Sequence, residues 1–181
     1  MKSLLFIIPF SAVAIALLSC CKSGSGMLGG KDAPMGRLKA FSYTENASMA
    51  QPERWFDIKL NDDSATATLI VRGVRDIIIP EDRKDDYDFQ YQLSETGDSV
   101  QVPASVLDSV AQVIISHKMY KYKEHYRPRF EVFDGTSWSL NASYDNYEDG
   151  FSSGGYMEWP SDDGIDIVAG ILKEAYLAAH K

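Results

Sequence analysis

One stretch near the C-terminus, residues 133–160, constrains the fold of this 181-residue chain more than any other. Apolar and polar residues alternate along residues 138–145, which is typical of a strand with one buried face. The side chains expected to face the core are Trp138, Leu140, Ala142 and Tyr144. Asp149-Gly150 then indicates a chain reversal, so the sequence predicts a β-hairpin whose second strand starts at Phe151.

Two consecutive glycines, Gly154 and Gly155, lie inside this predicted second strand. Glycine weakens a strand interior, so it usually indicates a bulge, a positive φ angle or a close approach of other atoms to the backbone. Pro160 has no backbone N–H to donate and is expected to end the strand. The hairpin is therefore interpreted as part of the architecture of the fold.

The hairpin also carries a resemblance. It contains Trp138-Ser-Leu, Tyr144-Asp, Asp149-Gly150 and the run Ser152-Ser-Gly-Gly-Tyr-Met-Glu-Trp-Pro160. This pattern resembles a family of small, uncharacterised bacterial domains that are often found as cell-envelope lipoproteins. The resemblance centres on residues 134–160 and extends more loosely over the chain after residue 37, while the turn at 146–149 is longer than the tight Asp-Gly turn of the family. It implies an envelope location and no catalytic residues.

The N-terminal segment predicts export and lipidation. Lys2 precedes an apolar run at residues 4–18, which is shorter than the roughly 20 residues needed to span a bilayer. Leu17-Leu18-Ser19-Cys20 then resembles a bacterial lipobox, so we expect a signal peptide at 1–19 and a lipid on Cys20. Alternatives are an ordinary signal peptide, a plain membrane anchor, or lipidation of Cys21. The expected organisation continues with a flexible tether at 20–36 and one domain at 37–181.

Composition excludes several classes of protein. Cys20 and Cys21 are the two cysteines, so the predicted domain has no disulfide, thiolate zinc site or cysteine nucleophile. The net charge of −8 argues against a general nucleic-acid binder. We expect no metal and no cofactor.

The remaining patterns predict an α+β fold. Strand patterns begin near Leu38, and the other expected strands are 56–60, 65–72, 89–93 and 130–133. One helix is expected to start at Pro103, with Leu107, Val110 and Ile114 on one face, and another to be capped by Ser161, with Ile165, Val168, Leu172, Ala175 and Ala179 on one face. We therefore expect a single antiparallel sheet with two helices packed on one face, in the order of four or five strands, helix, two strands, helix.

Three groups of residues are candidates for catalysis or metal binding. Residues 145–150 are similar to a calcium loop, but Tyr147 and Tyr156 occupy positions that need oxygen ligands, which favours a solvated turn. The three histidines, His117, His125 and His180, show no catalytic spacing. Glu158 lies between Met157 and Trp159, which leaves open a carboxylate-dependent hydrolase acting on envelope glycans.

Two groups of residues are candidates for binding a ligand or partner. Trp138, Tyr156 and Trp159 are candidate ligand-binding residues that could stack on a sugar, with core packing as the alternative. The basic and aromatic run at 117–129 suits an anionic partner, or else protects a strand edge. The sequence therefore predicts a non-catalytic envelope lipoprotein that acts as a binding or scaffolding module, attached to a membrane through its lipid. The alternatives are the hydrolase and an inhibitor or assembly partner of another envelope protein.

Overall fold

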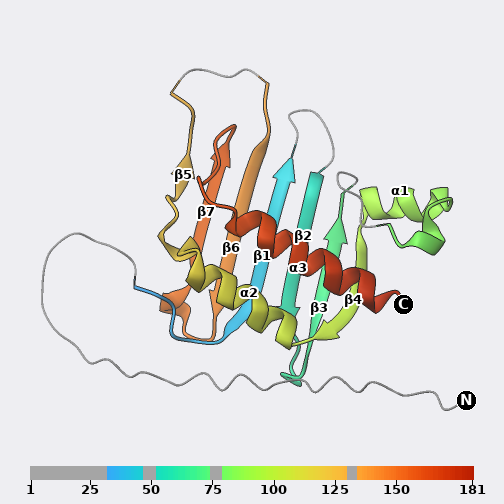
Figure 1. Ribbon diagram of the computed structural model, residues 1–181, viewed down its shortest axis with the longest axis horizontal. Coiled ribbons are helices and arrows are strands. Elements are labelled where there is room, and N and C mark those ends of the chain that lie inside the picture. The colour runs from blue at the N-terminus through green and yellow to red at the C-terminus, as the bar shows by residue number, and fades with distance from the viewer. Residues whose placement is uncertain (1–31, 47–51, 74–78, 130–133) are drawn as a thin grey trace, which may run out of the picture.

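The strands of the protein form one seven-stranded sheet, in the order β4-β3-β2-β1-β6-β7-β5 (Figure 1). The computed structural model describes residues 32–46, 52–73, 79–129 and 134–181. The strands are β1 (Leu38–Asn46), β2 (Pro52–Leu60), β3 (Thr66–Arg72), β4 (Asp98–Pro103), β5 (His125–Tyr126), β6 (Ser137–Tyr144) and β7 (Phe151–Tyr156). The helices are α1 (Tyr87–Glu95), α2 (Ser105–Ser116) and α3 (Gly164–Ala179), with short 3-10 turns η1 (Glu81–Arg83), η2 (Met119–Lys121) and η3 (Tyr147–Asp149).

The α+β class is confirmed, but the sheet is mixed. Neighbouring strands run antiparallel everywhere except at one edge, where β5 runs parallel to β7. The chain enters β5 from α2 and η2, and no hairpin turn fixes the direction of β5 relative to β7. The expectation of a purely antiparallel sheet is therefore wrong at this edge.

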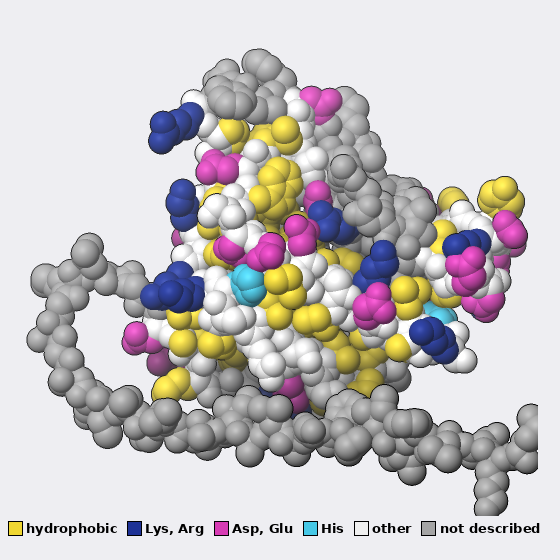
Figure 2. All heavy atoms as spheres, in the orientation of Figure 1, with side chains coloured by type: hydrophobic (Ala, Val, Ile, Leu, Met, Phe, Trp, Pro, Cys, Tyr) yellow, Lys and Arg dark blue, Asp and Glu magenta, His cyan; other side chains and the backbone are white. Residues whose placement is uncertain are grey.

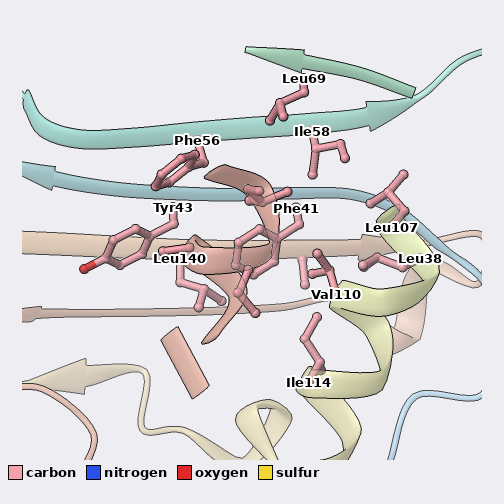
Figure 3. Packing of buried hydrophobic residues seen from close by; sticks show 14 of the residues in the cluster. Leu38, Phe41, Tyr43, Phe56, Ile58, Leu69, Leu107, Val110, Ile114 and Leu140 are labelled. Carbon is pink, nitrogen blue, oxygen red and sulfur yellow. The ribbon is translucent and has the colours of Figure 1, made fainter. Parts of the chain in front are cut away.

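Helices α2 and α3 lie on the same face of the sheet, as predicted (Figure 1). The side chains of Leu107, Val110 and Ile114 point from α2 toward the sheet, where Figure 3 shows them beside Leu38 and Phe41 of β1. On α3 the fully or nearly buried residues include Ile165, Val168, Leu172 and also Tyr176, which the sequence interpretation did not single out. The apolar faces of both helices and the sheet form one core.

The predicted strand at 89–93 is wrong, because this segment is helix α1. Phe89 and Leu93 are the buried residues of α1, and a spacing of four residues fits one face of a helix as well as one face of a strand. Asp86 decides between them, since its side chain accepts a hydrogen bond from the Phe89 backbone N–H at 2.9 Å and caps the helix. Tyr91, which would share the face of Phe89 and Leu93 in a strand, is 69 % exposed.

Both predicted helix starts also differ from the structure. Pro103 is the last residue of β4, a strand that the sequence interpretation missed, and α2 begins two residues later at Ser105. At α3 the N-cap residue is Asp163 and not Ser161, and no side chain caps the helix; just before it, Asp162 Oδ1 accepts the Gly164 N–H at 2.9 Å. Proline is tolerated at β4 because this strand lies at the sheet edge.

The predicted hairpin is confirmed as β6 and β7, and the segments 56–60 and 65–72 lie in or nearly coincide with β2 and β3. The four side chains predicted to face the core are all buried, namely Trp138, Leu140, Ala142 and Tyr144. The expected signal peptide, the lipidated Cys20, the tether up to residue 31 and the strand at 130–133 lie outside the described residues.

Candidate functional site

The face of the sheet opposite α2 and α3 is the open face, and within the described residues no helix packs on it. Because side chains alternate along each strand, every second residue points to it. These residues are exposed or half-buried and mostly carry hydroxyl, amide or charged groups; they include Ser42, Thr44, Asp57, Lys59, Thr68, Ser99, Gln101, Ser139, Asn141, Ser143 and Ser152. Ile70, 38 % exposed, is a large apolar side chain on this face.

Two adjoining hollows on the open face form what we call the groove. One has a volume of about 370 Å³ and the other about 470 Å³, and they share Glu124, Asn141 and Ser152. The first is also bordered by His125, Arg127, Ser139, Gly154 and Tyr156. Both volumes fall in the range of roughly 300–1,000 Å³ that small-molecule sites occupy. The serine and asparagine side chains that border both hollows can exchange hydrogen bonds with a polar ligand.

The groove exists because the segment before β5 is fixed to the edge of β7. The Ser153 hydroxyl donates to the Lys123 carbonyl at 2.7 Å, and the Gly154 N–H donates to the Glu124 carbonyl at 3.1 Å. The segment therefore forms a wall beside β7. Gly154 faces the groove without a side chain, so the groove is not filled at this point.

The three predicted ligand-binding rings do not share one surface. Trp138 borders the groove, yet it is only 3 % exposed, and its Nε1 donates to the Glu158 carbonyl at 2.7 Å. Trp159 is 36 % exposed and hydrogen bonds through its side chain to Tyr43. Tyr156 lines the groove on the open face. Of the three rings, Tyr156 is therefore the one placed to meet a ligand in the groove.

A buried charged cluster lies on the helix side of the sheet, and sequence reasoning missed it. Glu45 is 4 % exposed; its Oε2 accepts from Arg54 Nε at 2.8 Å and from the Tyr43 hydroxyl at 3.2 Å. Arg54 also reaches Asp166 of α3 at 3.2 Å. Burial and the nearby Glu45 carboxylate raise the pKa of Tyr43, so its hydroxyl stays protonated and donates. The signal was present, because Glu45 follows Phe41 and Tyr43 in the core-facing alternation of β1.

Two histidines that looked isolated in the sequence connect elements of the fold. His180 Nε2 lies 2.9 Å from Asp98 Oδ2, the oxygen that also accepts from the Tyr176 hydroxyl at 2.8 Å. His117 Nδ1 lies 3.3 Å from Asp163 Oδ1 and so joins the end of α2 to the start of α3. Burial and the hydrogen bond to Asp98 raise the pKa of Tyr176. These contacts join α3 to β4 and to the end of α2, so they have a structural role.

Two carboxylates of the turn at 145–149 bind the backbone just before β1. Asp149 Oδ2 accepts the backbone N–H groups of Met35 and Gly36 at 3.1 and 2.9 Å, and Asp145 Oδ1 accepts that of Arg37 at 2.8 Å. Burial and the charge of Asp149 raise the pKa of Tyr144 to about 12. The carboxylates that suggested a calcium loop therefore hold the chain just before the first strand.

Among the residues that the structure describes, the Glu158 carboxylate forms no ion pair, and the Glu158 backbone carbonyl accepts the hydrogen bond of Trp138 Nε1. The same described part of the chain contains no group of three or more His, Cys, Asp and Glu side chains that could hold a metal ion. It also contains no helix with the length and apolar character needed to cross a membrane.

No family model, no curated protein and no solved structure matches this chain. The resemblance of the hairpin to envelope lipoprotein domains therefore stays a prediction, and the function is argued from sequence and geometry.

Proposed function

We propose that the protein is a lipid-anchored, non-catalytic binding module of the bacterial cell envelope, and that its binding surface is the groove on the open face. The observation that carries the proposal is the pair of adjoining hollows of about 370 and 470 Å³ over β6 and β7, which are bordered by the polar side chains of Ser139, Asn141, Ser143 and Ser152. A sheet face built for packing would present apolar side chains, whereas this one presents serine and asparagine hydroxyl and amide groups.

The arrangement of the acids favours binding over hydrolysis. A hydrolase of the carboxylate type needs two acids facing one cleft with separated pKa values. The buried Glu45 and the half-buried Asp98 are held by Arg54 and by Tyr176 with His180, on the helix side of the sheet. Asp57, whose pKa is raised by burial, lies over β2 beside Lys59 and does not border the groove. Glu124 borders the groove, but its side chain is exposed and lies 4.0 Å from His125 Nε2.

The contacts of Asp145 and Asp149 with the chain just before β1 support a domain that is joined to its membrane anchor by a tether. Residues 35–37 are held by Asp145 and Asp149, so a tether ending there would join the domain at one fixed corner. The first hollow of the groove lies farther along β6 and β7, over Ser139 and Gly154, whereas the second hollow reaches Tyr144 and Gly150 next to this corner.

Replacement of Cys20 by serine should release the protein from the membrane. Each buried methylene contributes roughly 0.8 kcal/mol, so loss of the acyl chains removes most of the affinity for the bilayer. Fractionation of cells that express either form would show the wild-type chain in the membrane pellet and the variant in the soluble fraction. Cys21→Ser is the matched control and should stay in the pellet. A Cys20→Ser protein that remains membrane-bound would contradict the anchor.

Binding at the groove can be tested by hydrogen exchange. The full chain in neutral detergent would be mixed with a library of envelope glycan and peptidoglycan fragments, and amide exchange compared with and without each fragment. We expect slower exchange in β6 and β7 and recovery of every bound fragment intact. Fragments recovered in cleaved form would identify an enzyme, and protection confined to other strands would move the binding surface.

A further inference from the structure

Five exposed cations lie on one segment beside the groove, and we call them the basic rim: Lys118, Lys121, Lys123, Arg127 and Arg129. The segment contains one acid, Glu124, although the whole chain carries a net charge of −8. Among the described residues, no ion pair is formed by any cation of the rim. Five cations without acidic partners on an acidic protein indicate an anionic partner.

The basic rim meets the groove at Arg127. Arg127 and His125 border the groove directly. Figure 2 shows dark-blue side chains along the side of the molecule where Figure 1 places β5. Lys123 Nζ lies 5.3 Å from the centre of the Tyr126 ring, which packs against Trp138 on the helix side of the sheet, so this cation lies at the sheet edge beside β5. At physiological salt, charges act over about 8 Å, so the nearer cations of the rim add to the field that Arg127 creates at the groove.

The polar side chains of β6 and β7 and the guanidinium of Arg127 suit different parts of one ligand. The hydroxyl and amide groups of Ser139, Asn141 and Ser152 can each exchange hydrogen bonds with the hydroxyls of a sugar, and the Tyr156 ring offers a surface for its C–H groups. The guanidinium of Arg127 suits a carboxylate or phosphate, which it can bind through two hydrogen bonds.

We propose that the groove binds an acidic saccharide, with its sugar hydroxyls on the polar side chains of β6 and β7 and its anionic group at Arg127. The inference rests on the proposed function, because it names the ligand class of the same groove. Protection of a strand edge by lysines would account for the rim but not for the hollow beside it. A flat bilayer surface would meet the rim but could not enter the groove.

The test measures binding by calorimetry with the full chain in neutral detergent. The probes are oligogalacturonate, its uncharged methyl ester, a phosphorylated oligosaccharide with its dephosphorylated form, and phosphatidylcholine vesicles with or without phosphatidylglycerol. We expect an acidic saccharide to bind about tenfold or more tightly than its neutral counterpart, and to weaken as salt rises, because an anionic group adds a charge-assisted hydrogen bond.

Variants locate the site. Arg127→Gln and Asn141→Ala should each weaken binding of the acidic saccharide about tenfold, while Arg127→Gln alone should abolish the preference over the neutral form. Both residues are exposed, so the variants should fold, which circular dichroism would check. Lys84→Gln is the matched control, because it removes an exposed cation near α1 at the opposite edge of the sheet, and it should bind like wild type.

The possible results distinguish a wrong ligand class from a wrong binding surface. Equal binding of acidic and neutral saccharides would overturn this inference and leave the binding module intact. Binding to phosphatidylglycerol vesicles without binding to any saccharide would overturn it in favour of a membrane-facing rim. Absence of binding to every probe, together with no protection in β6 and β7 by the envelope library, would overturn both proposals.

Discussion

Replacement of Arg54 by methionine should lower the free energy of unfolding by about 3–5 kcal/mol. The reason is the carboxylate that would remain behind. Glu45 is 4 % exposed, and Arg54 Nε lies 2.8 Å from its Oε2, so this guanidinium is the cation that compensates a charge held away from water. Without it, the Tyr43 hydroxyl at 3.2 Å would be left to solvate the carboxylate, and one hydrogen bond does not replace a full opposite charge. Chemical denaturation followed by fluorescence would measure the loss.

A double variant separates the charge from the packing of the arginine. In Glu45→Gln with Arg54→Met the buried charge is gone, so the protein should be more stable than Arg54→Met alone, with a coupling energy of at least about 1 kcal/mol. Asp166→Asn serves as the control, because the Asp166 side chain is 73 % exposed and its pairing with Arg54 should contribute less than about 1 kcal/mol. A double variant no more stable than the single one would show that Arg54 acts through packing alone.

The elements that the sequence predicted correctly share a strong local pattern. Trp138, Leu140, Ala142 and Tyr144 alternate with polar residues over a full strand, and all four are buried. The faces of α2 and most of α3 likewise repeat at the helical period. In these cases the local pattern of apolar and polar residues predicts which side chains are buried, and no knowledge of distant contacts is needed.

The elements that were missed depend on weaker signals or on distant parts of the chain. In α1, Phe89 and Leu93 fit both periods, and only the capping side chain of Asp86 distinguishes them. The parallel strand β5 has two residues, too few for any period, and its place is set by contacts with Gly154 and Gly155 about thirty positions later.

The candidate site was only partly predictable for the same reason. The stacking hypothesis grouped three aromatic residues by their nearness in sequence. Adjacent positions of paired strands point to opposite faces, so Trp138, opposite Gly155, faces the core while Tyr156 borders the groove. The groove itself needs the wall formed by residues 123–127, which no local pattern of β6 and β7 reveals. The basic run at 117–129 was visible, but its place beside a polar hollow required the fold.

Replacement of Gly155 by alanine should lower the free energy of unfolding by about 3 kcal/mol or more. A Cβ at this position would lie 2.8 Å from Cε2 of the Trp138 ring and 2.5 Å from the Glu158 carbonyl oxygen. These are the two sides of the hydrogen bond by which Trp138 Nε1 donates to Glu158 at 2.7 Å. The methyl group would force the indole and the backbone apart, so overpacking of the core and loss of a buried hydrogen bond act together. Denaturant unfolding and the near-ultraviolet signal of Trp138 would report both effects.

Two other glycines provide matched controls for the same substitution. At Gly154 the added Cβ would lie 3.0 Å from the Trp138 carbonyl oxygen, so Gly154→Ala should cost about 1 kcal/mol. At Gly170, within α3, nothing lies within 4 Å, and alanine should stabilise the helix by about 0.5–1 kcal/mol. The expected order, from Gly170→Ala through Gly154→Ala to Gly155→Ala, follows from what a single methyl group meets at each place. A Gly155→Ala protein as stable as Gly154→Ala would show that the indole of Trp138 can move aside without cost.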